Sequence, residues 1–144
     1  MFLKKFRELN ERRRKMELPK DVENLCRSQY WPVTPTGSNY ICPDNPNNDD
    51  EDFLIQVHGS EESVRFALSS LSKLGYEFHS NIHYQDLAND FISFKKGTIN
   101  LIVTRSLAFA EKWRAATNIC KVLNVTEKEM RIKLFRAALY NEVQ

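Results

Sequence analysis

The spacing of apolar residues along the chain predicts both helices and strands. Apolar side chains recur every three or four positions, as on one face of a helix, in the segments 2–17, 20–30, 60–74, 106–124 and 130–140. Unbroken or alternating apolar runs predict strands at 53–57, 91–94 and 99–104. The order helix, helix, strand, helix, hairpin, helix, helix favours an α/β (α+β) fold, in which a small mixed sheet is covered by helices.

Local signals set the limits of these elements. Pro19 ends the first helix, because the residue before a proline is disfavoured in helical geometry. Ser60 is the expected cap of the helix that follows it, and a capping box at 126–129 begins the last helix. The hairpin turns at Gly97. Its second strand is apolar except for Asn100, so we expect this strand at the centre of the sheet.

Charge is unevenly distributed along a chain that is nearly neutral overall, with a formal net charge of +2. Residues 1–20 hold eight lysines or arginines against three glutamates, whereas 44–52 holds five acidic residues and no basic one. The length of 144 residues suits one domain at 20–144, preceded by a basic N-terminal helical extension at 1–19. The basic residues within 4–20 either bind nucleic-acid phosphates or form the solvated face of a helix.

Cysteine content and hydropathy indicate a cytoplasmic protein. Three cysteines, an odd number without close pairing in the sequence, fit reduced thiols in a reducing compartment. No apolar run approaches the roughly 18 residues that a membrane span requires, so we expect no membrane partner. The basic N-terminus also lacks the apolar segment of a secretion signal.

An acidic cluster lies immediately before the first predicted strand. Side chains alternate in an extended chain, so Asp50 and Asp52 project to one face, about 7 Å apart. Such a pair suits Mg²⁺, which binds carboxylates and shares its other positions with water and substrate phosphates. Before it, the Gly37-Ser38 turn offers backbone N–H groups and a hydroxyl to a phosphate. The alternative is a solvated acidic loop that keeps a sheet edge from pairing.

This arrangement resembles the signature of the nucleotidyltransferase superfamily, which includes polymerase beta, kanamycin nucleotidyltransferase and CCA-adding enzymes. The signature is Gly-Ser, a spacer that has eleven residues here, and then Asp-x-Asp. The resemblance implies that Gly37 and Ser38 contact the phosphates of a nucleoside triphosphate, and that Asp50 and Asp52 bind metal in a site for two Mg²⁺ ions. It also places a third metal-binding position on the strand 99–104.

Asn100 occupies that third position, where members of the superfamily have Asp or Glu. An amide oxygen ligates Mg²⁺ weakly, carries no charge and cannot accept a proton as a general base. Glu51 also departs from the pattern, because the residue between the two aspartates is ordinarily apolar. The candidate catalytic residues are therefore Asp50, Asp52 and Asn100, and whether they catalyse a reaction depends on Asn100.

The stretch from 40 to 140 is also similar to small phage-encoded proteins that are classed as nucleotidyltransferases. The similarity rests on the segments DFISFKKGTINLIVT, AATNICKVLNV and EKEMRIKLFRAALY. It implies a phage origin, and therefore the cytoplasm of the host cell as the location.

Two functions follow from these patterns. The first is a nucleotidyltransferase that binds a nucleoside triphosphate with Mg²⁺ and transfers a nucleotidyl group to a host protein, an RNA end or a small molecule. The second is a catalytically inactive protein of the same fold that binds a host macromolecule, as an inhibitor of a bacterial defence factor or an antitoxin-like partner. The pair Asp50 and Asp52 favours the first, and Asn100 favours the second.

Several other side chains have both a functional and a structural interpretation. Four basic residues on or after the hairpin either meet a triphosphate or confer solubility: Lys95, Lys96, Arg105 and Arg114. His79 and His83 have a spacing that zinc sites use, but no cysteine lies near them in the sequence. Trp31 and Trp113 are interpreted as core residues rather than as platforms for stacking bases.

Overall fold

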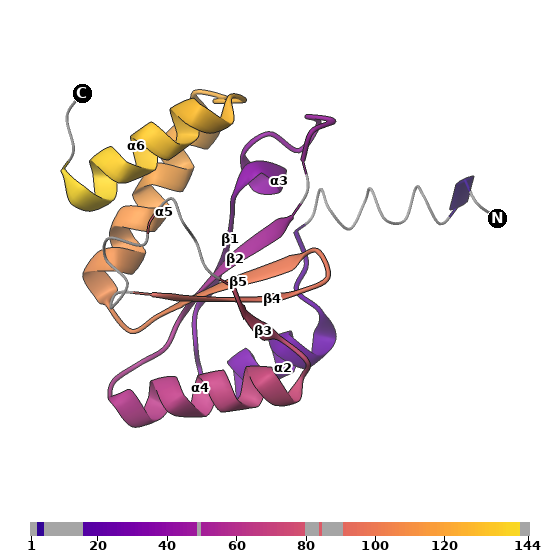
Figure 1. The fold of residues 1–144 in the computed structure, drawn as a ribbon, viewed down its shortest axis with the longest axis vertical. Helices are drawn as coiled ribbons and strands as arrows, with labels where there is room; N and C mark the ends of the chain where they lie inside the picture. The colour runs from indigo at the N-terminus through magenta and orange to yellow at the C-terminus, as the bar shows by residue number, and fades with distance from the viewer. Residues whose placement is uncertain (1–2, 5–15, 49, 80–83, 85–90, 142–144) are drawn as a thin grey trace.

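A computed structural model shows a five-stranded mixed sheet with helices on both faces (Figure 1). It describes residues 3–4, 16–48, 50–79, 84 and 91–141. The helices are α2 (Lys20–Ser28), α3 (Ser38–Ile41), α4 (Glu61–Lys73), α5 (Leu107–Val122) and α6 (Lys128–Tyr140). The strands are β1 (Val33–Thr36), β2 (Glu51–Gln56), β3 (Glu77–His79), β4 (Ile92–Lys96) and β5 (Ile99–Thr104). The predicted fold class is confirmed.

The strands lie in the order β1-β2-β5-β4-β3. Strands β2 and β5 are parallel, whereas the other neighbouring strands are antiparallel. Strand β5 occupies the centre, as its apolar sequence predicts, and all of its residues are buried. The hairpin from β4 to β5 turns at Gly97, whose φ of +59° is a conformation that glycine adopts readily.

Each face of the sheet carries its own apolar core. Phe53 and Ile55 of β2 pack in a cluster with side chains of α2 and α4, whereas Leu54 packs in a second cluster with side chains of α5 and α6. Figure 1 shows the same division, with α2 and α4 on one side of the sheet and α5 and α6 on the other. Because side chains alternate along a strand, Asp52 shares the face of Leu54, toward α5 and α6.

Most predicted helices and strands are present, with limits shifted by a few residues. The predicted helix at 2–17 falls largely outside the described residues. Ser60 is the N-cap of α4 as predicted, although its side chain makes no capping hydrogen bond. The predicted capping box of α6 is wrong, because Glu127 is the N-cap and no side chain caps this helix. No helix within the described residues is long and apolar enough to cross a membrane.

Three short elements were not predicted from the sequence. Strand β1 contains Pro35, which lacks a backbone N–H. The proline is tolerated because β1 is an edge strand, which has no neighbouring strand on its outer side to hydrogen-bond with. Helix α3 is a single turn that follows Gly37. Strand β3 is a short edge strand whose three residues are all exposed, so it lacks the apolar pattern of a buried strand.

Candidate functional site

Four polar side chains lie in one row across the sheet. Strand register places each directly opposite the next: Thr36 of β1, Asp52 of β2, Asn100 of β5 and Lys95 of β4. Residues directly opposite one another in a sheet project to the same face. The register of the parallel pair β2 and β5 therefore brings Asp52 and Asn100 together, although 48 positions separate them in the chain.

The Gly37-Ser38 turn lies against this row. Gly37 has φ +76° and ψ −177°, a combination that is essentially restricted to glycine. A Cβ placed on Gly37 would overlap the carboxylate of Asp52. The buried Asn39 side chain then donates a hydrogen bond of 2.6 Å to the backbone carbonyl of Asp50. The turn and the acidic segment are thus fixed beside each other, as the resemblance implies.

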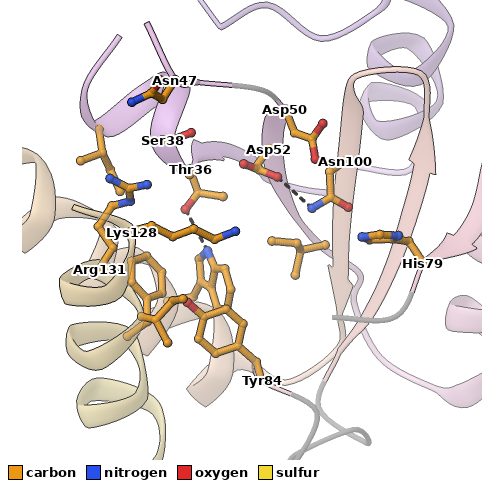
Figure 2. Close-up of a pocket in the computed structure, with 16 residues that line it drawn as sticks. Thr36, Ser38, Asn47, Asp50, Asp52, His79, Tyr84, Asn100, Lys128 and Arg131 are labelled. Atoms are coloured by element: carbon orange, nitrogen blue, oxygen red, sulfur yellow. Dashed lines mark hydrogen bonds between the residues drawn. The ribbon is translucent and has the colours of Figure 1, made fainter. Parts of the chain in front are cut away.

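Asn100 contacts Asp52 but leaves one of its own polar atoms unused. Its Nδ2 donates a hydrogen bond of 2.8 Å to Asp52 Oδ1 (Figure 2). Asn100 is 7% exposed, and its Oδ1 has no hydrogen-bond partner among the described residues. A buried acceptor without a partner is rare in proteins and is a position where a donor or a cation is expected.

The two aspartates are in different electrostatic environments. Asp50 forms an ion pair with Lys95, with 3.1 Å between Oδ2 and Nζ. Asp52 has no such ion pair in the described part of the chain, and burial raises its pKa to about 7. The charge of Asp50 raises this pKa further, while the Asn100 hydrogen bond and the charges of Lys95 and Arg131 lower it. Asp52 is therefore the carboxyl group of the site that titrates near neutral pH.

These residues line a pocket of about 430 Å³ between the sheet and α6. Its polar end contains all five of the residues predicted for the site: Gly37, Ser38, Asp50, Asp52 and Asn100. Its lining also includes apolar and aromatic side chains: Ile41, Tyr84, Ile102, Trp113, Ile132 and Phe135. In Figure 2 the labelled side chains of Asp50, Asp52 and Asn100 lie side by side, with Lys128 and Arg131 on the opposite side of the pocket.

Lys128 and Arg131 are pocket residues that the sequence analysis did not identify. Arg131 is anchored by hydrogen bonds from Nη1 to the backbone carbonyls of Thr126, at 2.6 Å, and Val125, at 3.2 Å. The sequence contains one signal that could have identified Lys128 as a functional residue. Its positive charge lies in the first turn of α6, where the helix dipole makes a positive charge unfavourable.

The basic residues that were proposed to meet a triphosphate have other positions. Lys95 pairs with Asp50, and Lys96 donates a hydrogen bond to the backbone carbonyl of Leu74, remote from the pocket. Arg114 donates hydrogen bonds to Gln56 Oε1. None of these four side chains, Lys95 and Arg105 included, is among the described residues that line the pocket.

A buried hydrogen-bond chain supports the pocket wall behind the row. Trp113 Nε1 donates to Thr36 Oγ1 at 2.9 Å, and the hydroxyls of Thr36 and Thr117 lie 2.7 Å apart. Thr117 Oγ1 itself donates to the Trp113 carbonyl at 2.8 Å, so the Thr36 hydroxyl donates to Thr117. Trp113 is a core residue, as predicted, and its indole N–H also fixes the end of β1.

The remaining candidate residues do not join the site. Glu51 is fully buried on the opposite face of β2 from Asp52. His79 lines the pocket, but His83 lies outside the described residues, so the zinc hypothesis stays untested. No group of three or more His, Cys, Asp or Glu side chains in the described ranges is arranged to hold a metal. Most of the basic residues within 4–20 also lie outside those ranges, and nucleic-acid binding there stays a prediction.

The oxygen atoms of the site fit one divalent cation. Asp50 and Asp52 supply carboxylate oxygens, and Asn100 can supply its amide Oδ1 if the amide turns to present this atom in place of Nδ2. Carboxylate and amide oxygens are the hard ligands that Mg²⁺ binds, and a cation with so few protein ligands keeps positions for water and phosphate. The cation would also offset the repulsion between Asp50 and Asp52.

Comparisons with known proteins find one distant likeness among solved structures. The crystal structure of conserved protein GrpB from Enterococcus faecalis is similar with a TM-score of 0.47 and 17% sequence identity, over 85% of this chain and 90% of that one. No family model and no curated protein matches the chain. The function is therefore argued from the residues of the site alone.

Proposed function

We propose that the pocket binds a nucleoside triphosphate together with Mg²⁺, and that the protein is a phage nucleotidyltransferase that transfers a nucleotidyl group to a protein, an RNA end or a small molecule. One observation carries the proposal: Gly37-Ser38, Asp50, Asp52 and Asn100 converge on one pocket, and Asn100 Oδ1 is buried there without a partner. The residues come from three separate segments of the chain, so a solvated acidic loop does not account for their convergence.

The lining of the pocket has groups for both parts of a nucleotide. The glycine turn and the cationic side chains of Lys128 and Arg131 suit the phosphates. The aromatic and aliphatic side chains of the lining are typical of walls that hold a base or sugar. Positive charge opposite the acidic pair is what a polyphosphate with a cation requires.

Each residue of the site would have a separate role. Asp50, Asp52 and Asn100 Oδ1 would hold the cation, which when bound neutralises phosphate charge and polarises the phosphoryl group. Lys128 and Arg131 would orient the phosphates. Asn100 cannot accept a proton, and Asp52 must release its own proton to ligate the cation, so neither side chain is assigned as the general base.

Transfer of label tests this proposal. The protein is incubated with each labelled nucleoside triphosphate, Mg²⁺ or Mn²⁺, and a lysate of the host bacterium, and labelled products are sought in the protein, RNA and small-molecule fractions. We expect transfer that is lost in Asp50→Asn and Asp52→Asn. The proposal is wrong if calorimetry detects no nucleotide binding and no labelled product forms.

A second function is favoured by the contacts of the acidic pair. Lys95 already provides a cation for Asp50, and Asn100 already provides a donor for Asp52. A site whose charges are satisfied internally is stable without metal, which suits a catalytically inactive protein that binds a host macromolecule. In that case Asp50→Asn and Asp52→Asn would leave the effect of the protein on its host unchanged, and this outcome separates the two functions.

A further inference from the structure

The acidic pair of the pocket is neutralised on one side only. The Lys95 ammonium lies 3.1 Å from Asp50 Oδ2, and both side chains are 32% exposed. On the other side, Asp52 receives only the uncharged amide of Asn100, whose Oδ1 remains buried without a partner in the described structure. The site therefore has one cation of its own, paired with Asp50, and Asp52 has no cation beside it among the described residues.

The strand register of the sheet determines the position of Lys95. Lys95 lies directly opposite Asn100 in the antiparallel pair of β4 and β5, so its side chain projects on the face of the row. The next residue, Lys96, projects to the other face, where its Nζ donates a hydrogen bond to the Leu74 carbonyl. The same strand thus offers one lysine at the site and a matched lysine away from it.

We propose that Lys95 takes the place of one of two metal ions, so that the site binds a single divalent cation on its Asp52 side, where Asn100 ligates the ion once its amide turns Oδ1 in place of Nδ2 toward Asp52. This inference rests on the proposed binding of a nucleotide with a cation at this site. With Asp52 ionised, Asp50, Asp52 and Lys95 together carry one net negative charge, which attracts a first divalent ion. The bound ion leaves one net positive charge, which repels a second ion. Lys95 and Asn100 both make the binding of a second divalent ion less favourable. Lys95 adds positive charge to the site, and Asn100 lacks the negative charge that a third carboxylate would supply.

The test is the number of Mn²⁺ ions bound per chain, measured by the electron paramagnetic resonance signal of free Mn²⁺ in a titration of the full chain. We expect one ion for the wild type and two for Lys95→Met, which keeps the length of the side chain and removes its charge. Lys96→Met removes the same charge from the opposite face, and Lys95→Arg keeps the charge at the site. Both controls should bind one ion.

Two ions in the wild type, no ion in the wild type, or one ion in a folded Lys95→Met variant would each overturn the inference. Circular dichroism shows whether each variant is folded. If Lys95→Met is unfolded, Lys95→Gln replaces it in the same test. Nucleotide binding is measured separately by calorimetry. If the wild type binds one Mn²⁺ but no nucleotide, the proposed function is wrong and the inference about Lys95 is still supported. If it binds nucleotide and two Mn²⁺ ions, the proposed function is supported and the inference about Lys95 is wrong.

Discussion

The α-carbon of Gly37 lies so close to the Asp52 carboxylate that no side chain fits between them. Gly37→Ala is therefore expected to lower the free energy of unfolding by about 2–3 kcal/mol, through the overlap and through a backbone conformation that alanine avoids. Urea denaturation measures the change. Gly97→Ala is the control, because that glycine also has a positive φ but open space around its α-carbon. Its cost should be about 1 kcal/mol, and an equal cost at both positions would contradict the close approach.

The raised pKa of Asp52 predicts a stability that depends on pH. The folded state holds the Asp52 proton up to about pH 7, whereas the unfolded chain releases it near 3.8. The stability that Asp52 contributes is fully present below pH 3.8, the pKa of this group in the unfolded chain. It is lost as the pH rises to about 7, the pKa of this group in the folded state. With a chelator present, Asp52→Asn should gain stability over the wild type between pH 4 and pH 8, by on the order of 1–3 kcal/mol.

Urea denaturation of both proteins at several pH values measures this gain. Asp44→Asn removes a carboxylate from an exposed position outside the pocket and serves as the control. A stability difference between Asp52→Asn and the wild type that is the same at every pH would show that Asp52 is ionised throughout.

The hydroxyl of Thr36 is expected to stabilise the fold through its two buried hydrogen bonds. Thr36→Val would leave the indole N–H of Trp113 without an acceptor, at a cost of about 1–3 kcal/mol. Thr34→Val is the matched control on the same strand, because the Thr34 Oγ1 is buried without a partner in the described structure and its replacement should be neutral or stabilising. Thermal unfolding compares the two variants, and an equal loss at both positions would refute the role of the hydrogen-bond chain.

Asn100→Asp introduces a carboxylate at the position where the sequence resemblance predicts one. In a chelator the variant should be less stable than the wild type by roughly 1–3 kcal/mol, because the donor to Asp52 is lost and like charges meet. Mg²⁺ should raise the melting temperature of the variant more than that of the wild type. A response to Mg²⁺ that is equal in the two proteins would mean that position 100 does not contact the cation.

Lys128 is expected to contribute to phosphate binding from the far side of the pocket. Lys128→Ala should weaken the binding of Mg²⁺ with a nucleoside triphosphate by roughly five- to tenfold, a loss of about 1 kcal/mol. Lys133→Ala removes the same charge from an exposed position of α6 outside the pocket and should leave the affinity unchanged. Calorimetry measures both, and equal losses would indicate long-range attraction instead of contact.

The sequence predicts the elements whose apolar pattern is strong. Strand β5 was placed at the centre of the sheet because five of its six residues are apolar or β-branched, and helix α4 was recognised by Ser60 and its apolar spacing. Strand β1 was missed because Pro35 is a signal against a strand, and only its position at the sheet edge makes the proline acceptable. Edge position is a property of the assembled sheet.

The same reasoning applies to the site. Asp50, Asp52 and Asn100 were identified from spacing and resemblance, and their convergence required the parallel register of β2 and β5. The sequence predicts for Lys95 either contact with phosphate or a role in solubility. Its pairing with Asp50 could not be predicted, because it depends on which face of β4 the side chain occupies. Lys128 and Arg131 were missed because the packing of α6 across the sheet brings them to the pocket.

The row of side chains across the sheet has a consequence for how this protein evolves. Backbone hydrogen bonds align its members, so a substitution such as Asn100→Asp changes the charge of the row without changing its geometry. Asn and Asp are encoded by neighbouring codons, and a lineage that carries this scaffold is a point mutation away from a different metal requirement. Under the proposed function, one such substitution would move the pocket between a catalytic and a binding role while the fold is inherited intact.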